Sequence, residues 1–133
     1  MSSLAIEVNP EFMIHSDLTV SNIDHFDDFS VHDLYNGYCW YHFTTHTADS
    51  AELGVQMCFH NHKLHSVKLA LTDKTKYGSS WSDWSESKEK QCAVDTESWL
   101  NTLGSTPGTY GWGSIWAGYD PKAATGYALI NCL

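Results

Sequence analysis

The sequence predicts an α+β fold: a mostly antiparallel sheet of about five or six strands, with one helical segment inserted before the C-terminal hairpin. Aromatic and β-branched residues alternate with other types through much of the stretch from Tyr38 to Leu71, which is typical of strands. A helical spacing then precedes Gly104, and the two-residue period returns from Tyr110 onward. The 133 residues show neither an internal repeat nor a linker, so we expect a single domain over residues 1–133.

The N-terminal part carries weaker patterns. Residues 1–17 have no sustained period, and Pro10 interrupts their one short alternation, so they predict an edge strand or a tail. From Leu18 to Phe29 the apolar spacing changes from two to three, which predicts a strand that passes into a turn of helix. Asn36-Gly37 is a turn signal, and Tyr38 to Thr45 is predicted to be a strand with aromatic residues on both faces.

Two apolar segments in the middle of the chain predict a β-hairpin. They run from Leu53 to Phe59 and from Leu64 to Leu71, and the polar residues 60–63 join them. Alternation along the second segment sets one group of side chains inward: His65, Val67, Leu69 and Leu71. Residues 72–80 are expected to form a polar loop.

A helix is predicted to follow this loop and to end at Gly104, which suits a left-handed stop. The candidate caps are Ser80, Ser82 and Asp83. Asp83-x-x-Glu86 resembles a capping box. The side chains near one helical face are Trp84, Cys92, Trp99 and Leu103. The alternative is two short helices with a break near Val94, because Asp95-Thr96-Glu97 could cap a fresh start.

The last part of the chain predicts the C-terminal hairpin. From Tyr110 to Gly118 large rings are interleaved with glycines, which let a strand bend and let another chain approach its backbone. A loop over residues 119–126 turns the chain, and a final strand runs from Tyr127 to Leu133.

The charge of the chain favours a basic protein as the partner. Sixteen acidic and seven basic residues give a formal charge of −9, and every basic residue is a lysine. Arginine usually provides the bidentate capture of phosphate or of a guanine edge, so its absence argues against nucleic-acid binding. An acidic surface attracts a basic partner and raises the rate of encounter at low salt.

The cysteines and the N-terminus predict cytoplasmic residence. Cys39, Cys58, Cys92 and Cys132 lie far apart within apolar runs, which favours buried free thiols over disulfides. The first ten residues lack the basic start and apolar centre of a secretory signal. No run approaches the roughly 20 apolar residues of a membrane span, so we expect no membrane partner.

Four aspartates crowd one short region: Asp24, Asp27, Asp28 and Asp33. The region lacks the Asp-x-Asp-x-Asp-Gly loop of a specific calcium site, so a solvated acidic face is favoured over a metal site. Such a face is a candidate surface for binding the basic partner.

The histidines His60, His62 and His65 form a His-x-His-x-x-His cluster. Zinc binds imidazole well, and the first two side chains would lie on one side of an extended chain. A hydrated turn is nevertheless favoured, because side chains at a hairpin tip rarely converge on one ion. Cys58 and His60 share a strand face as a weaker candidate pair for thiol catalysis. There is no serine elbow, phosphate-binding glycine loop or dinucleotide fingerprint, so we expect no cofactor and no enzymatic activity.

Five of the six tryptophans lie after residue 79. Core packing explains most of them, and the alternative is an aromatic groove for a sugar ring, a peptide or a partner's anchor residue. Trp81, Asp83, Trp84 and Glu86 combine rings with acids, as protein-interface hot spots do, and are candidate partner-binding residues.

Five segments in the second half of the chain form a distinctive set: Trp81-Ser82-Asp83-Trp84-Ser85-Glu86, Trp99-Leu100, Gly104, Trp112-Gly113-Ser114-Ile115-Trp116 and Tyr119-Asp120-Pro121-Lys122. Through these segments the chain resembles small bacterial immunity proteins of polymorphic or contact-dependent toxin systems. The resemblance implies a cytoplasmic, non-enzymatic protein that binds one cognate toxin domain and blocks it. It identifies no binding residue.

The leading hypothesis is therefore an acidic binding module that neutralises a basic toxin domain, for which a nuclease is one candidate because its surface must hold phosphate. The alternative is a small metal-dependent enzyme or a carbohydrate-binding domain, which would use the histidine cluster or an aromatic groove.

Overall fold

The computed structural model describes residues 3–78 and 80–133, and these form nine strands and two α-helices. Residues 1, 2 and 79, which the expected N-terminal segment and polar loop include, lie outside the described residues. The strands are β1 (Ala5–Asn9), β2 (Phe12–His15), β3 (Asp27–Asp33), β4 (Tyr38–His46), β5 (Glu52–His60), β6 (Lys63–Leu71), β7 (Gly108–Tyr110), β8 (Gly113–Asp120) and β9 (Thr125–Cys132). The helices are α1 (Lys74–Tyr77) and α2 (Glu86–Thr102), and two 3-10 turns are η1 (Val20–Asn22) and η2 (Trp81–Asp83).

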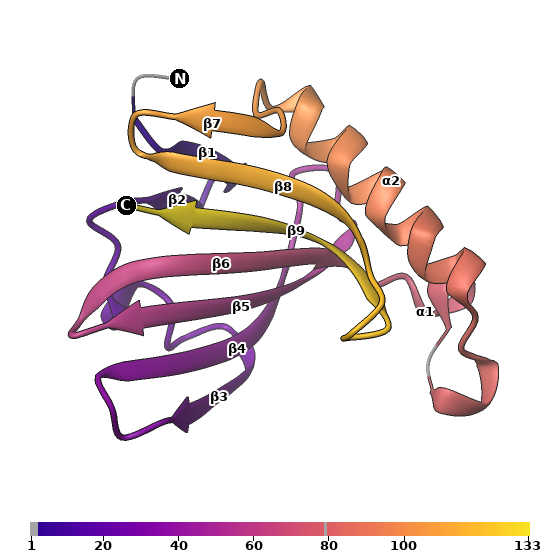
Figure 1. Cartoon of the computed structure of the whole chain (residues 1–133), viewed down its shortest axis with the longest axis horizontal. Coiled ribbons are helices and arrows are strands. Elements are labelled where there is room, and N and C mark those ends of the chain that lie inside the picture. The colour runs from indigo at the N-terminus through magenta and orange to yellow at the C-terminus, as the bar shows by residue number, and fades with distance from the viewer. Residues whose placement is uncertain (1–2, 79) are drawn as a thin grey trace.

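The predicted α+β architecture is confirmed, and the sheet is larger than expected. Seven strands form one antiparallel sheet in the order β3-β4-β5-β6-β9-β8-β7, and β1 pairs with β2 in a separate two-stranded sheet (Figure 1). The main helix α2 precedes the C-terminal strands, as predicted. The additional strands of the large sheet are its two edges, β3 and β7.

Alternation gives the large sheet two different faces. The helix-side face presents buried side chains to α2 and to the β1–β2 hairpin, among them Phe43, Val55, Leu69, Ile115 and Ile130. Each such side chain contributes roughly 1.5–3 kcal/mol on full burial, so this face holds the core. The opposite face, here called the open face, carries Trp40, His42, Gln56, Lys68, Trp116 and Leu129 on successive strands. These six side chains are half-buried or exposed.

The N-terminal segment is a packed hairpin, so the alternative of a tail is wrong. β1 and β2 pair in antiparallel register around the turn at Pro10, and their alternate side chains Ile6, Val8, Phe12 and Ile14 are buried in the common core. The order expected for Leu18 to Phe29 is also wrong, because the helical turn η1 comes first and β3 begins at Asp27. The apolar spacing of two and then three along this segment arises because Leu18 and Ile23 are buried.

The central strands follow the prediction, except that a β-bulge changes the register of β6. β4 and β5 pair without a shift over their whole length, and β5 and β6 form the predicted hairpin. A shift between Cys58 and Phe59 places Phe59 opposite Leu64 and Cys58 opposite Ser66. The intervening His65 is therefore exposed and Leu64 is buried, contrary to strict alternation.

A single helix runs from Glu86 to Thr102, so the alternative of two short helices is wrong. Its cap is Ser85, whose hydroxyl accepts a hydrogen bond from the Lys88 backbone N–H at 3.1 Å. Asp83 instead accepts from the Ser80 backbone N–H at 2.9 Å and so belongs to η2. The predicted stop is confirmed, because Gly104 has φ +79° and the Ser105 N–H bonds back to the Leu100 carbonyl.

The buried residues of α2 differ from the predicted apolar set. They are Cys92, Ala93, Thr96 and Leu100, while Trp84 lies before the helix. Thr96 is fully buried because its hydroxyl accepts a hydrogen bond from the Leu71 N–H of β6, at 3.2 Å. Trp99 and Leu103, which were predicted on this face, are partly buried against the core, and Thr96 adds a polar residue to it.

The strand predicted from Tyr110 is interrupted near its start. β7 ends at Tyr110, and the chain turns at Gly111-Trp112 before β8 begins at Gly113. Gly113 has φ +153°, and a Cβ there would lie 1.8 Å from the Asn131 carbonyl oxygen of β9. The glycine lets the two strands approach, as the interleaved glycines suggested.

Neither described helix has both the length and the apolar character needed to cross a membrane.

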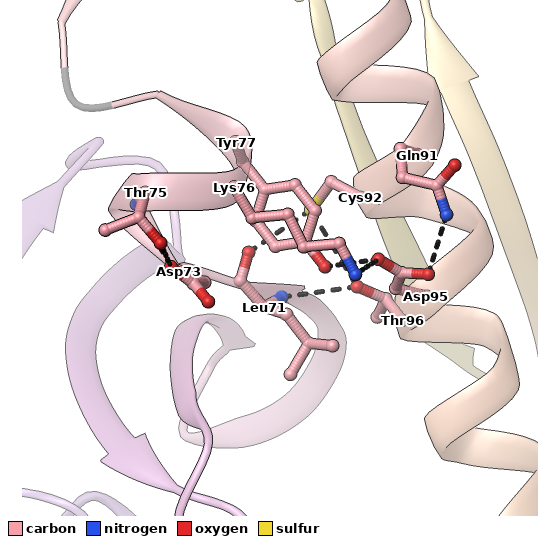
Figure 2. Close-up of polar contacts among 9 residues, drawn as sticks. All are labelled: Leu71, Asp73, Thr75, Lys76, Tyr77, Gln91, Cys92, Asp95 and Thr96. Carbon is pink, nitrogen blue, oxygen red and sulfur yellow. Dashed lines mark hydrogen bonds and ion pairs between the residues drawn. The ribbon is translucent and has the colours of Figure 1, made fainter.

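A polar network joins α1, α2 and the end of β6 (Figure 2). The Asp95 carboxylate accepts hydrogen bonds from the Tyr77 hydroxyl at 2.5 Å and from Gln91 Nε2 at 2.8 Å, and it forms an ion pair with Lys76 at 2.8 Å. Burial alone would raise the pKa of Asp95, but these three contacts outweigh it and hold the pKa below its ordinary value. Tyr77 is buried, so the carboxylate satisfies a phenolic hydroxyl that has little access to water.

Replacing Asp95 with asparagine is expected to lower the free energy of unfolding by about 1–2 kcal/mol at neutral pH, mainly by weakening the bond to the buried Tyr77 hydroxyl. A carboxyl whose pKa is depressed on folding stabilises the fold above its ordinary pKa of 3.8 and loses this contribution as the pH falls through the lowered value. The difference between wild type and Asp95→Asn should therefore shrink below about pH 4. Urea unfolding at neutral and acidic pH measures both effects.

The matched control for this prediction is Glu86→Gln, which removes the exposed ion pair with Lys90 on the same helix. Its expected effect is below about 0.5 kcal/mol, because both side chains are more than half exposed. Equal losses in the two variants would contradict the assigned role of the Tyr77–Asp95 bond.

Candidate functional site

The negative charge of the protein resides in its first half. Residues 1–62 contain nine acidic residues and no lysine, for a formal charge of −9, whereas residues 63–133 contain seven of each and sum to zero. The two ion pairs of the described residues, Lys76–Asp95 and Lys90–Glu86, both lie in the second half. Within residues 3–62, therefore, the structure pairs no carboxylate with a lysine.

The four predicted aspartates lie at one edge of the large sheet. Asp27, Asp28 and Asp33 belong to the edge strand β3, and Asp24 lies between η1 and β3. Asp28 occupies a β-bulge at φ +58°, where its carboxylate accepts a hydrogen bond from the Thr44 hydroxyl at 3.2 Å. We call β3 with Asp24 the acidic edge. The structure thus brings these four residues into one region of the surface.

Exposed apolar side chains accompany the aspartates. Val31 of β3 is 55% exposed, and Leu34 and Tyr35 in the β3–β4 turn are 43% and 91% exposed. Tyr35 has φ +58°, and its backbone N–H donates to Asp33 Oδ1 at 2.8 Å. Apolar groups within an acidic rim have the composition of a protein-binding surface.

A hollow of about 540 Å³ adjoins the acidic edge on the helix-side face. Residues from η1, β3, β4, β5 and the turns between them line it: Thr19, Val20, Ser21, Asp33, Tyr35, Gly37, Cys39, Tyr41, Phe59, Asn61 and His62. Asp33 is the one carboxylate among these lining residues, and none of them is a lysine. The pKa of Tyr41 is raised to about 12 by its hydrogen bond with the Cys39 side chain, by burial and by electrostatic interaction with Cys39 and with the Asp33 carboxylate.

The second predicted group of partner-binding residues lies elsewhere. Trp81 and Asp83 belong to η2, Trp84 lies between η2 and α2, and Glu86 is the first residue of α2. Figure 1 shows β3 at the lower left and the start of α2 at the lower right, so the two groups do not form one continuous patch.

The tryptophans of this second group have different surroundings. Trp81 is 76% exposed, whereas the indole N–H of Trp84 donates to the Ala124 carbonyl at 2.9 Å. Trp84 therefore fastens the β8–β9 turn to the helix start, and Trp81 is the ring of this pair that is more available to a partner.

The three clustered histidines do not converge. His60 stacks on Tyr38 with ring centroids 4.2 Å apart, and the exposed His65 at the β6 bulge meets the same ring edge to face at 5.4 Å, whereas His62 lines the hollow. Asn61 and His62 have φ of +50° and +69°, so the chain is not extended where His60 and His62 were expected to share a side. Among residues 3–78 and 80–133, no group of three or more histidines, cysteines or carboxylates could hold a metal ion.

The four cysteines are unpaired, and two of them are buried. Cys58 shares the open face with His60, as predicted from alternation, but burial raises the pKa of its thiol. A raised pKa disfavours the thiolate that nucleophilic chemistry needs.

A second hollow, of about 460 Å³, lies at the open face near α2. Its polar lining includes Asp28, His42, Gln56, Lys68 and Glu89. The Lys68 ammonium lies 4.2 Å from the centroid of the Tyr127 ring, and burial, followed by the charges of His32 and Lys68, lowers the pKa of His42. This is the nearest counterpart of the predicted aromatic groove, but its mixture of both charges selects no single class of ligand.

Comparisons of the chain with protein families, with curated proteins and with solved structures found no match. The resemblance to immunity proteins therefore stays a prediction. The aspartates can be identified from the sequence, but the hollow beside them cannot, because the rings of the hollow come from four separate segments. Tyr35, next to the Asn36-Gly37 turn signal, was the one local indication of an exposed ring near the acids.

Proposed function

We propose that this protein is a non-enzymatic binding module that neutralises a basic partner, most simply as the immunity protein of a bacterial toxin domain. The observation that carries the proposal is the unpaired negative charge of residues 1–62 beside exposed apolar groups on the acidic edge. Charge of one sign speeds the encounter with an oppositely charged protein, and apolar contact then supplies affinity.

A nuclease domain fits this charge best among toxin activities. A nuclease presents lysine and arginine to phosphate, and an acidic inhibitor can occupy the same surface. The acidic edge offers β3 as an edge strand as well as side chains, so main-chain hydrogen bonds to an extended segment of the partner are available there. Cytoplasmic residence and the absence of catalysis belong to the same proposal.

The test is complex formation with the catalytic domain of a toxin encoded next to this chain's gene. Co-expressed domains should co-purify, and the complex should lack toxin activity. Because the encounter is electrostatic, the dissociation constant should rise at least about tenfold between low and moderately high salt, as the screening length falls below about 10 Å.

Calorimetry at two salt concentrations measures this dependence. Absence of a complex with a basic neighbouring toxin, or an affinity that salt does not change, would count against the proposal.

A further inference from the structure

The hollow beside the acidic edge has a floor of fixed aromatic rings. The Tyr41 and Phe59 rings meet edge to face with centroids 5.6 Å apart, and Phe29 stacks on Tyr41 at 5.8 Å. Phe59 is buried in the core, so the floor is anchored to the rest of the sheet. Flat ring surfaces that need no rearrangement can receive another planar group at little entropic cost.

The lining of the hollow includes a positioned carboxylate. Asp33 Oδ1 accepts the Tyr35 backbone N–H at 2.8 Å, which holds the acid at the start of the β3–β4 turn. Tyr35 also lines the hollow and is almost fully exposed. No lysine lines the hollow, and among the described residues Asp33 forms no ion pair, with His62 or with a lysine.

We propose that this hollow receives an arginine side chain from the partner, an inference that rests on the proposed function. The planar guanidinium would stack on the Tyr35 or Tyr41 ring and pair with the Asp33 carboxylate. Arginine suits both contacts because its fork matches a carboxylate and its plane matches an aromatic face.

The charge inside the hollow argues against other occupants. An apolar anchor would strip water from Asp33 without pairing it, which carries a desolvation cost. An anionic group would face a carboxylate with no lysine among the lining residues to offset it. A volume of about 540 Å³ also leaves room for the backbone on either side of the arginine.

The test uses a short peptide, N-acetyl-Gly-Arg-Gly-amide, titrated into the whole protein and followed by NMR. Saturable shifts should concentrate at Asp33, Tyr35, Tyr41 and Asn61, with a dissociation constant in the millimolar range typical of one anchored side chain. The same peptide with citrulline, which keeps the shape but not the charge, should bind at least about tenfold more weakly. Absence of saturable shifts at these residues would overturn the inference.

Variants of the protein locate the contact. Asp33→Asn keeps the acceptor for the Tyr35 N–H, so the turn should persist while arginine binding falls at least about tenfold. Asp49→Asn removes one charge from an exposed turn outside the hollow and should leave binding unchanged within about twofold. Tyr35→Ala should weaken binding without unfolding the protein, because Tyr35 is exposed. Equal losses in Asp33→Asn and Asp49→Asn would overturn the assignment to this hollow.

The peptide test is independent of the toxin. If the peptide fails to bind while the toxin domain still forms a salt-sensitive complex, the arginine site is wrong and the proposed function stands. If the peptide binds at Asp33 but no basic toxin domain forms a complex, the proposed function fails and the hollow is an arginine site for another protein.

Discussion

Replacing Gly126 with alanine is expected to lower the free energy of unfolding by about 3 kcal/mol, at the upper end of the usual cost of an inserted methyl group. A Cβ at this position of β9 would lie 1.9 Å from the Glu89 carbonyl oxygen and 3.1 Å from the Ala93 Cβ, both on α2. The first contact is with helix backbone, which cannot move aside without shifting α2 from the sheet. Urea denaturation measures the loss, and a lowered slope against urea would reveal a native state that has already loosened.

Gly111→Ala is the matched control, because a Cβ there meets no atom within 4 Å and its φ is not positive. Its free energy of unfolding should stay within about 0.5 kcal/mol of wild type. If the Gly126→Ala variant is as stable as the Gly111→Ala variant, α2 does not pack as closely against β9 as described. The Gly126 N–H also donates to Glu89 Oε1 at 3.1 Å, so helix and strand touch through backbone and side chain at the same place.

The fold class can be predicted from the sequence because the central strands and the end of the main helix have strong local signals. β4, β5 and β6 alternate over long runs, and Gly104 ends α2 where a left-handed residue is needed. The local sequence around Gly126 indicates only a loop. Its contact with α2 joins residues 37 positions apart, and no local pattern reports such an approach.

The features that the sequence does not predict are those in which alternating residues are not buried on one face. β3 is an edge strand rich in aspartate, and most of its residues are exposed, so alternation had little to record. The bulge at His65 cannot be read from spacing alone, because it depends on how β6 pairs with β5. The sequence does not indicate that Thr96 is buried, because only the position of the Leu71 N–H explains a buried hydroxyl there.

The candidate site, like the fold, can be predicted from the sequence only in part. The aspartates were identifiable from composition, and the absence of lysine from residues 1–62 is visible in the sequence. The hollow was not, because η1, β3, β4 and β5 must fold before Val20, Asp33, Tyr41 and Phe59 share one surface. Composition thus predicts what kind of partner to expect, and topology decides where it can bind.

Removing three charges from the acidic edge is expected to slow association with a basic partner about tenfold at low salt, since electrostatic steering accounts for factors of roughly 10 to 1,000 in such encounters. The variant combines Asp24→Asn, Asp27→Asn and Asp33→Asn, and leaves Asp28 intact because it bonds to Thr44 at the bulge. Asparagine retains an oxygen acceptor, so the Asp33–Tyr35 turn contact should survive. Stopped-flow association with the toxin domain measures the rate constant.

The matched control removes the same number of charges from the second half of the chain: Asp83→Asn and Glu86→Gln close in sequence to the exposed Trp81, and Glu97→Gln further along α2. Seven lysines offset the seven acids of residues 63–133, so the formal charge of this half of the chain is zero. The association rate constant of the control variant should therefore fall at most about twofold. At high salt both variants should associate at nearly the rate of the wild-type protein at the same salt concentration, because screening removes electrostatic steering but leaves short-range contacts. A larger loss of rate in the control would indicate that the partner binds at the turn that carries Trp81 and not at the acidic edge. Equal losses in the two variants would mean that the overall charge of the protein, and not the placement of that charge, governs the encounter.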